Sequence, residues 1–289
     1  MKHPSAPLAA AEGQSVSEPD VVRNLVREKL ARDEVVSSMT VRLVRGVEVA
    51  RIARTAGFDS LYIDLEHSSF EFETASQICI AALDAGITPF VRVATAQPDH
   101  IARALDGGAL GVIAPHIRSA DDAKRLVDAA MFPPLGTRSY SPALPQTRYR
   151  PLPPEVQYRT INDVTMLTVM LETRDALEHV EEIAAVEGIA MLLVGTNDLS
   201  GELGIPGQYG HQRIREAYER TIAACRAAGK HVGVGGLASQ PAIAASFVEM
   251  GARYVSTGTD LGFLLAAATE KARAVAAMTP ARSAEATRN

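Results

Sequence analysis

Short apolar runs alternate with amphipathic stretches over most of the chain. The apolar runs predict eight strands, which cover residues 35–41, 60–66, 89–93, 111–116, 166–172, 189–195, 231–236 and 254–260. Alanine-rich stretches with helical spacing separate them, and several end at Gly57, Gly86 or Gly229, as helices commonly do. A further short helix is expected over residues 19–32.

This order of elements indicates the fold class. Eight strands, each followed by a helix, predict a closed, parallel (β/α)8 barrel of the α/β class. A doubly wound open sheet is the alternative if the strand count is wrong, but no G-x-G-x-x-G motif follows the first strand. We expect one barrel domain over residues 19–279, between a disordered extension at 1–18 and a flexible tail at 280–289.

The composition excludes several classes of protein. Of the 289 residues, 47% are hydrophobic and 22% are charged, and the net charge of −5 gives no reason to expect binding to nucleic acid or a membrane surface. No apolar run approaches the roughly 18 residues of a membrane span, and no basic segment before an apolar run marks a secretory signal. The two cysteines, Cys79 and Cys225, make no disulfide framework, so we expect a cytoplasmic protein.

Polar side chains gather where the predicted strands end. In a (β/α)8 barrel the active site lies at the carboxyl ends of the strands. The residues found there are Asp64, Glu66, His67, Arg92, His116, Glu172, Asn197 and Asp198. Carboxylates that repel one another can share a space when a divalent cation binds between them. Glu172 and Asp198 end adjacent strands, so they are candidate ligands of Mg²⁺ or Mn²⁺.

Simpler interpretations exist for single members of this set. Asp198 could cap the following helix, and His116, which follows Pro115, could bond to backbone alone. The glycines that end the last two strands either cradle a phosphate or only permit tight turns. None of the five lysines ends a strand, so Schiff-base catalysis has no candidate amine, and electrophilic help must come from a metal and Arg92.

A proline-rich segment runs from Phe132 to Thr165. Long loops inside a compact domain are usually functional or mobile. We therefore expect residues 132–160 to close over or border the site, with Arg138 or Arg148 contacting an acidic aldehyde. The alternative is that both arginines tie the loop to neighbouring subunits.

Several segments resemble the motifs of the HpcH/HpaI class II aldolases. They are YIDLEHS at 62–68, FVRV at 90–93, FPPLGTRS at 132–139, LETRDAL at 171–177 and GTNDLSGELG at 195–204. The similarity runs from about residue 35 to 275 and keeps the order and spacing of the motifs. It implies reversible cleavage of 4-hydroxy-2-oxo or 2-keto-3-deoxy acids to pyruvate and an aldehyde. It also implies a divalent metal (Mg²⁺, Mn²⁺ or Co²⁺) and a homotrimer or homohexamer.

The resemblance also implies roles for single residues around the histidine. His67 matches the catalytic base of the family, and Arg92 matches the arginine that stabilises the transition state. Asp106, in RALDGG, matches the acid that pairs with that histidine. Asp64 and Glu66 flank the base in the same motif. We therefore expect His67, Arg92 and Asp106 to be the catalytic residues.

Further positions match the metal and substrate sites of the family. Glu172 and Asp198 correspond to metal ligands, and the backbone amides of Asn197 and Asp198 correspond to the group that holds the pyruvyl carboxylate. Met170 stands where the family often has Gln, and the first strand lacks the Trp and Gly often found there, so the aldehyde stays open. Oxaloacetate decarboxylation, which gives the same pyruvate enolate, is the alternative activity, as in the relative macrophomate synthase. A non-catalytic binding barrel is the third possibility.

Overall fold

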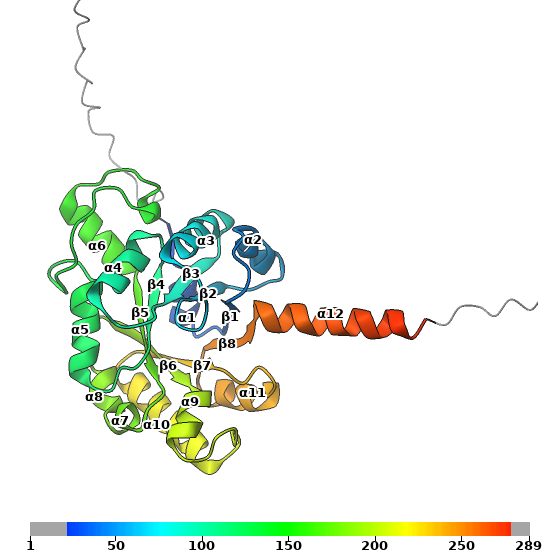
Figure 1. Ribbon diagram of the computed structural model, residues 1–289. Helices are drawn as coiled ribbons and strands as arrows, with labels where there is room; N and C mark the ends of the chain where they lie inside the picture. Colours follow the sequence, from blue (N-terminus) through cyan, green and yellow to red (C-terminus); the bar gives the residue numbers. More distant parts are fainter. Residues whose placement is uncertain (1–21, 279–289) are drawn as a thin grey trace, which may run out of the picture.

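Eight parallel strands close into a barrel in the computed structural model, which describes residues 22–278 (Figure 1). The strands are β1 (Val36–Val41), β2 (Ser60–Asp64), β3 (Thr88–Arg92), β4 (Gly111–Ala114), β5 (Met166–Leu171), β6 (Ile189–Gly195), β7 (His231–Gly235) and β8 (Tyr254–Thr259). Neighbours in the barrel are neighbours in the chain, and β8 pairs with β1. The predicted closed (β/α)8 barrel is confirmed. The predicted extension at 1–18 and tail at 280–289 lie outside the described residues.

Helices follow the strands and surround the barrel. They are α2 (Glu48–Thr55), α3 (Phe72–Ala85), α4 (Pro98–Asp106), α5 (Ala120–Ala130), α6 (Pro154–Val164), α7 (Arg174–Glu178), α8 (Val180–Ala184), α9 (Thr196–Glu202), α10 (Gln212–Ala227) and α11 (Pro241–Met250), with a short 3-10 helix η2 (Pro145–Thr147) and a last helix α12 (Asp260–Ala276). Apart from α6, η2 and α12, these helices pack their apolar faces on the outward-facing side chains of the strands. Cys79 and Cys225 are free thiols inside this core. Within residues 22–278, no helix is both long enough and apolar enough to cross a membrane.

Large side chains fill the barrel, and a short helix closes one end of it. The interior residues are Val36, Tyr62, Phe90, Ile113, Met166, Met170, Met191, Leu193 and Tyr254. Val26 and Leu30 of α1 (Leu25–Ala31) pack against this set from the amino-terminal end of the strands. Asn24 caps α1 and donates hydrogen bonds to the carbonyls of Leu110 and Val164, just before β4 and β5. The space for a substrate therefore lies at the opposite, carboxyl end.

The proline-rich segment lies at the amino-terminal rim of the barrel. Because α5 carries the chain back from the carboxyl end of β4, the segment after it begins where the strands start. Gln146 of η2 donates hydrogen bonds of 2.6 and 2.9 Å to the carbonyls of Leu105 and Ala109, which precede β4. The expectation that residues 132–160 border the site of their own chain is therefore wrong. The physical reason is that α5 returns the chain to the amino-terminal rim before this segment begins.

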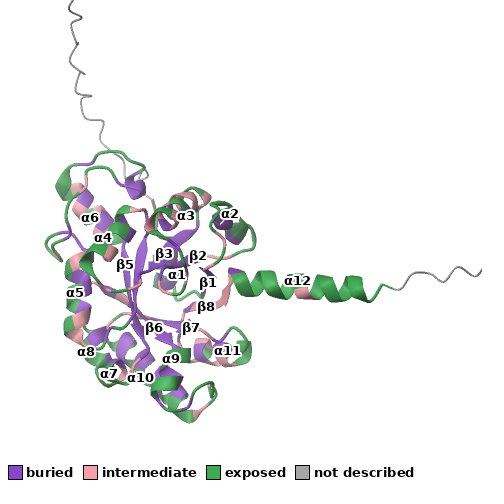
Figure 2. Cartoon of the chain, viewed as in Figure 1, coloured by how far each residue is buried: buried purple, intermediate pink, exposed green. Residues whose placement is uncertain are grey.

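The last helix, α12, leaves the barrel instead of covering it. Figure 1 shows it pointing away from the body of the molecule, and Figure 2 shows nearly its whole length exposed. In a (β/α)8 barrel the helices form a ring on the outside of the strands. The exposed apolar side chains of α12 include Leu261, Phe263, Leu264, Leu265 and Val275. Only its first residue, Asp260, is buried among residues 260–276.

Candidate active site

A cavity of about 440 Å³ opens at the carboxyl ends of the strands. Tyr62, Met170 and Leu193 of the barrel interior form part of its lining. The other polar lining residues are Thr40, Arg42, His67, Arg92, Thr196, Asn197, Asp198, Tyr209, Ser239, Ser256, Thr257 and Thr259. Four residues predicted from the sequence, His67, Arg92, Asn197 and Asp198, thus meet in one space.

A buried ion pair joins β2 to β3 beside this cavity. Asp64 and Arg92 are direct partners in the register of the two strands. Arg92 Nε donates a hydrogen bond of 2.9 Å to Asp64 Oδ1, and Nη2 donates a second bond to Oδ2. Burial by itself would raise the pKa of Asp64, but the hydrogen bonds and charge of Arg92, with the charge of Arg42, hold that pKa below its usual value. The pair is therefore ionised at neutral pH.

A chain of contacts leads from this pair to the predicted metal ligand. Arg92 Nη1 lies 2.7 Å from Glu66 Oε2, and Glu66 Oε1 lies 2.9 Å from His116 Nε2. His116 Nδ1 lies 3.2 Å from Glu172 Oε1, which also accepts the backbone N–H of His116 at 2.8 Å. His116 therefore contacts two acids of the site as well as offering its backbone. The backbone of His116 has a positive φ of 60°, which is uncommon for a residue other than glycine. Backbone conformations of this kind are enriched at functional sites.

The acids around Glu172 suit a divalent cation. Burial is the largest cause that raises the pKa of Glu172, and the charges of Glu66 and Asp198 add to it against the lowering effect of His116. Glu66 Oε2 is buried and accepts no well-aligned hydrogen bond among the described residues, although Arg92 Nη1 lies 2.7 Å from it. A cation would offset the repulsion between these carboxylates.

The Glu172 side chain packs directly against the Cα of Gly195, where there is little space for a larger side chain. A Cβ added to Gly195 would lie 3.0 Å from the Glu172 Cβ and 3.2 Å from its Oε2, so a larger residue there would require the Glu172 side chain to shift by a few tenths of an ångström. No group of three or more His, Cys, Asp or Glu residues that could hold a metal occurs within residues 22–278. Two carboxylates, from Glu172 and Asp198, still suit Mg²⁺, which usually keeps several waters or substrate oxygens as ligands.

His67 lies at the edge of the cavity without the partner expected for it. Its side chain is 53% exposed, and its Nε2 lies 3.9 Å from Glu66 Oε2. Asp106 ends α4 at the amino-terminal rim, where it accepts a 2.6 Å hydrogen bond from Arg138. Arg138 is buried and lies over the ring of Phe132. Within one chain, Asp106 therefore does not reach His67 and Arg138 does not reach the cavity, and the roles expected for both residues stay predictions.

Residues 45–267 match the family model described as HpcH/HpaI aldolase/citrate lyase. This chain belongs to that family. A 4-hydroxy-4-methyl-2-oxoglutarate aldolase of Chaetomium globosum is 37% identical to it, over 90% of this chain and 97% of the relative. A protein of the same name from Hapsidospora irregularis is 39% identical, over 88% and 96%. The crystal structure of an HpcH/HpaI aldolase from Desulfitobacterium hafniense matches with a TM-score of 0.82 and 28% identity, over 88% and 97%. The resemblance expected from the sequence motifs is confirmed.

Arg42 is a lining residue of this family member that was not predicted. It directly follows β1, and its Nε donates a 2.6 Å hydrogen bond to Asp64 Oδ2. The buried carboxylate of Asp260 accepts the backbone N–H groups of Arg42, Leu43 and Val44 at 2.8–3.0 Å. The rule that selected Arg92, a charged residue where a strand ends, identifies Arg42 when it is applied to the first strand as well.

Asp64→Asn tests the ion pair. The change leaves the buried guanidinium of Arg92 without its charged partner, so we expect a loss of about 3–5 kcal/mol in the free energy of unfolding at neutral pH. Because the pKa of Asp64 is lowered in the folded protein, the stabilisation is complete above the usual aspartate pKa of about 3.9. It disappears as the pH falls through the lower folded value.

Urea unfolding of wild type and Asp64→Asn, from neutral pH to about pH 3, measures this difference. The difference should be largest at neutral pH and shrink in acid. Asp84→Asn, at an exposed carboxylate of α3, is the matched control and should change little. A destabilisation by Asp64→Asn that is the same at every pH would refute the ionised pair.

Proposed function

We propose that this chain is a divalent-metal-dependent aldolase that cleaves a 4-hydroxy-2-oxo acid, reversibly, to pyruvate and an aldehyde. The observation that carries the proposal is the buried Asp64–Arg92 pair. It fixes the positively charged guanidinium of Arg92 beside the cavity, which His67 and Asp198 also line. Relatives that align with nearly all of the chain are named aldolases of such an acid. The chain is accordingly a carbon–carbon lyase.

Glu172 and Asp198 would hold the metal ion. Their carboxylate oxygens suit Mg²⁺, Mn²⁺ or Co²⁺, and Glu172 is almost fully buried. When bound, the ion supplies Lewis-acid stabilisation of negative charge on the keto oxygen, worth several kcal/mol. His116 holds Glu172 in place through its backbone N–H and its ring.

The remaining steps belong to side chains and backbone of the cavity. The amides of Asn197 and Asp198 at the start of α9 bind the pyruvyl carboxylate. Arg92, oriented by Asp64 and Glu66, places its positive charge where the enolate oxygen develops. His67 Nε2 takes the proton from the C4 hydroxyl as the C3–C4 bond breaks. The electron pair of that bond moves into the enolate, and C4 becomes the carbonyl carbon of the aldehyde. A proton from water then adds to C3 to give pyruvate, and His67 returns the proton that it took to the solvent, so that protons balance.

Oxaloacetate decarboxylation would use the same enolate and the same residues. The names of the relatives favour aldol cleavage. Rates of oxaloacetate loss and of aldol cleavage, measured at the same enzyme concentration, separate the two activities. Binding of pyruvate or oxalate without turnover of any hydroxy-oxo acid would instead indicate a binding barrel.

Glu172→Gln tests the proposed function. The wild type should release pyruvate from 4-hydroxy-2-oxo acids, lose this activity in EDTA and regain it with Mg²⁺ or Mn²⁺. In Glu172→Gln the activity should fall at least about 100-fold, because the metal-holding charge is lost. Mn²⁺ binding, followed by electron paramagnetic resonance, should weaken in parallel.

Glu182→Gln, at an exposed carboxylate of α8, is the control and should keep wild-type activity and Mn²⁺ affinity. Full activity after complete metal removal would overturn the role of the metal. Equal Mn²⁺ affinity of wild type and Glu172→Gln would overturn the ligand assignment.

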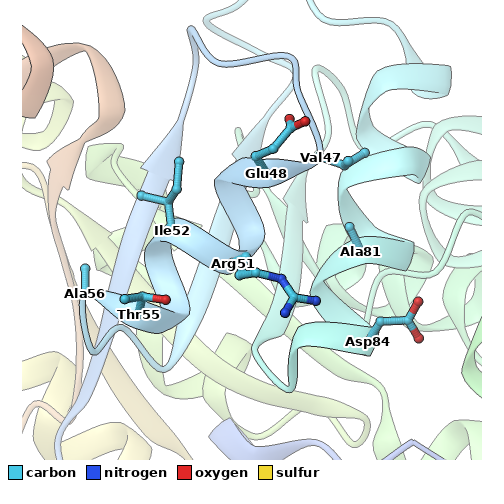
Figure 3. A pocket seen from close by; sticks show the side chains of 8 residues that line it. All are labelled: Val47, Glu48, Arg51, Ile52, Thr55, Ala56, Ala81 and Asp84. Carbon is cyan, nitrogen blue, oxygen red and sulfur yellow. The ribbon is translucent and has the colours of Figure 1, made fainter.

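We also propose that the protein is a homo-oligomer, a trimer or hexamer as the motif resemblance implies. The apolar side chains of α12 are exposed over most of the helix. Val47, just before α2, and Ile52 of α2 are exposed as well. A hollow of about 640 Å³ lies between α2 and α3. Figure 3 shows Val47, Ile52 and Ala81 among the side chains that line it. Exposed apolar surfaces of this kind mark protein interfaces. A cytoplasmic location stays a prediction.

The double change Leu264→Glu and Leu265→Glu tests the assembly. Two charges on the exposed face of α12 should oppose its burial in an interface and lower the molar mass measured by light scattering. Leu135→Glu changes an exposed leucine before α6 and should leave the mass unchanged. A wild type that runs as a monomer, or a double variant of unchanged mass, would contradict this role of α12.

A further inference from the structure

Arg42 differs from Arg92 in how much of its guanidinium is free. The Arg92 side chain is 4% exposed, and its three nitrogen atoms face Asp64, Glu66 and the sulfur of Met170. The Arg42 side chain is 35% exposed, and Asp64 engages only its Nε. Among the described residues, Nη1 and Nη2 of Arg42 have no hydrogen-bond partner. Two parallel N–H donors therefore remain for a ligand in the cavity.

The position of Arg42 is fixed from two sides. Asp260, at the start of α12, accepts the backbone N–H groups of Arg42 and the two residues after it. Asp64 fixes the other end through the bond to Nε. A fixed guanidinium loses less conformational entropy on binding than a mobile one. The guanidinium of Arg42 is thus preorganised for binding before a ligand enters the cavity.

The surroundings of Arg42 favour an anion. The lining from β1, β7 and β8 consists of hydroxyl groups and small residues, including Thr40, Ser256 and Thr257. Thr40 Oγ1 and Ser256 Oγ are hydrogen-bonded to each other at 3.0 Å. Asp198 is the one acidic side chain among the described lining residues, and it lies on α9. An anion near β1 and β8 would therefore meet hydroxyl groups and the free nitrogens of Arg42. The nearby carboxylates of Asp64 and Asp260 are buried and already accept hydrogen bonds from the protein.

We propose that Arg42 binds the carboxylate at the far end of a dicarboxylic 4-hydroxy-2-oxo acid, so that the released aldehyde is itself an acid. The proposal rests on the aldolase function proposed above and names the residue that sets its substrate class. The planar guanidinium fork matches the two oxygens of a carboxylate. The pyruvyl end occupies the side of Glu172 and Asp198, and the distal carboxylate faces β1.

The test compares 4-hydroxy-2-oxoglutarate with 4-hydroxy-2-oxopentanoate, in which a methyl group replaces the distal carboxylate. In Arg42→Met, the ratio of kcat/KM for the first to that for the second should fall by about ten- to a hundredfold, the range for one charge-assisted hydrogen-bonded contact. Arg42→Lys should lose part of the ratio, because it keeps the charge but not the fork. Circular dichroism checks that each variant is folded.

Arg45→Met is the matched control. Arg45 lies three residues further along, binds Ser69 and lies over the ring of Phe70, outside the lining of the cavity. The Arg45→Met variant should keep the wild-type ratio of the two kcat/KM values. A ratio that Arg42→Met and Arg42→Lys both leave unchanged overturns the proposal.

A binding experiment separates this proposal from the aldolase function. Calorimetry of the Mn²⁺-loaded protein with 2-oxoglutarate and 2-oxopentanoate should give tighter binding of the first to wild type and no such preference in Arg42→Met. If the wild type cleaves neither hydroxy acid but keeps this preference, the proposed function fails and the role of Arg42 stands. Equal affinities of the wild type for both acids overturn the role of Arg42.

Discussion

The ion pair between Asp64 and Arg92 is the interaction on which the geometry of the cavity depends. A guanidinium that is almost completely buried costs several kcal/mol unless a carboxylate neutralises it. The parallel register of β2 and β3 brings the two side chains level with each other. Asp64 also accepts the Nε–H of Arg42 and the backbone N–H groups of Glu66 and His67. One carboxylate thereby sets the positions of both arginines and of the loop that carries the proposed base.

The cavity is electrically divided around this pair. Glu66, His116, Glu172 and Asp198 gather on the side of β4, β5 and β6, where a cation would be bound. Arg42 lies on the side of β1 and β8, beside hydroxyl groups. A substrate with one carboxylate beside its keto group and a second at its far end matches both halves. The same division explains why each guanidinium nitrogen of Arg92, between the two sides, faces a protein partner, whereas only Nε of Arg42 does.

Much of this arrangement could be predicted from the sequence because parallel strands place all their carboxyl ends on one rim. The alternation of apolar and amphipathic segments was enough to find the eight strands, and the residues after them led to Asp64, Arg92 and Glu172. The rim on which a loop lies is harder to predict, because every returning helix reverses it. The proline-rich segment was assigned to the wrong rim for this reason.

Side-chain partners depend on which groups compete in space, and sequence spacing does not contain that information. Asp106 was expected beside His67, but the buried guanidinium of Arg138 lies within hydrogen-bonding distance of it at the other end of the barrel. His116 could have been only a backbone contact, yet its ring reaches both Glu66 and Glu172. The free face of Arg42 is visible only when its single bond to Asp64 is compared with the full set of contacts around Arg92.

The proposed aldolase reaction requires this cavity to stabilise the enolate of pyruvate. The most direct measurement is the exchange of the methyl protons of pyruvate in D₂O, followed by proton NMR, because it needs the pyruvyl half of the reaction and no aldehyde. The protein loaded with Mg²⁺ or Mn²⁺ should accelerate the loss of the methyl signal well above the rate in buffer, and Arg92→Lys should abolish most of that acceleration. Exchange at the rate of buffer alone, with the metal bound, would show that the cavity does not stabilise this enolate.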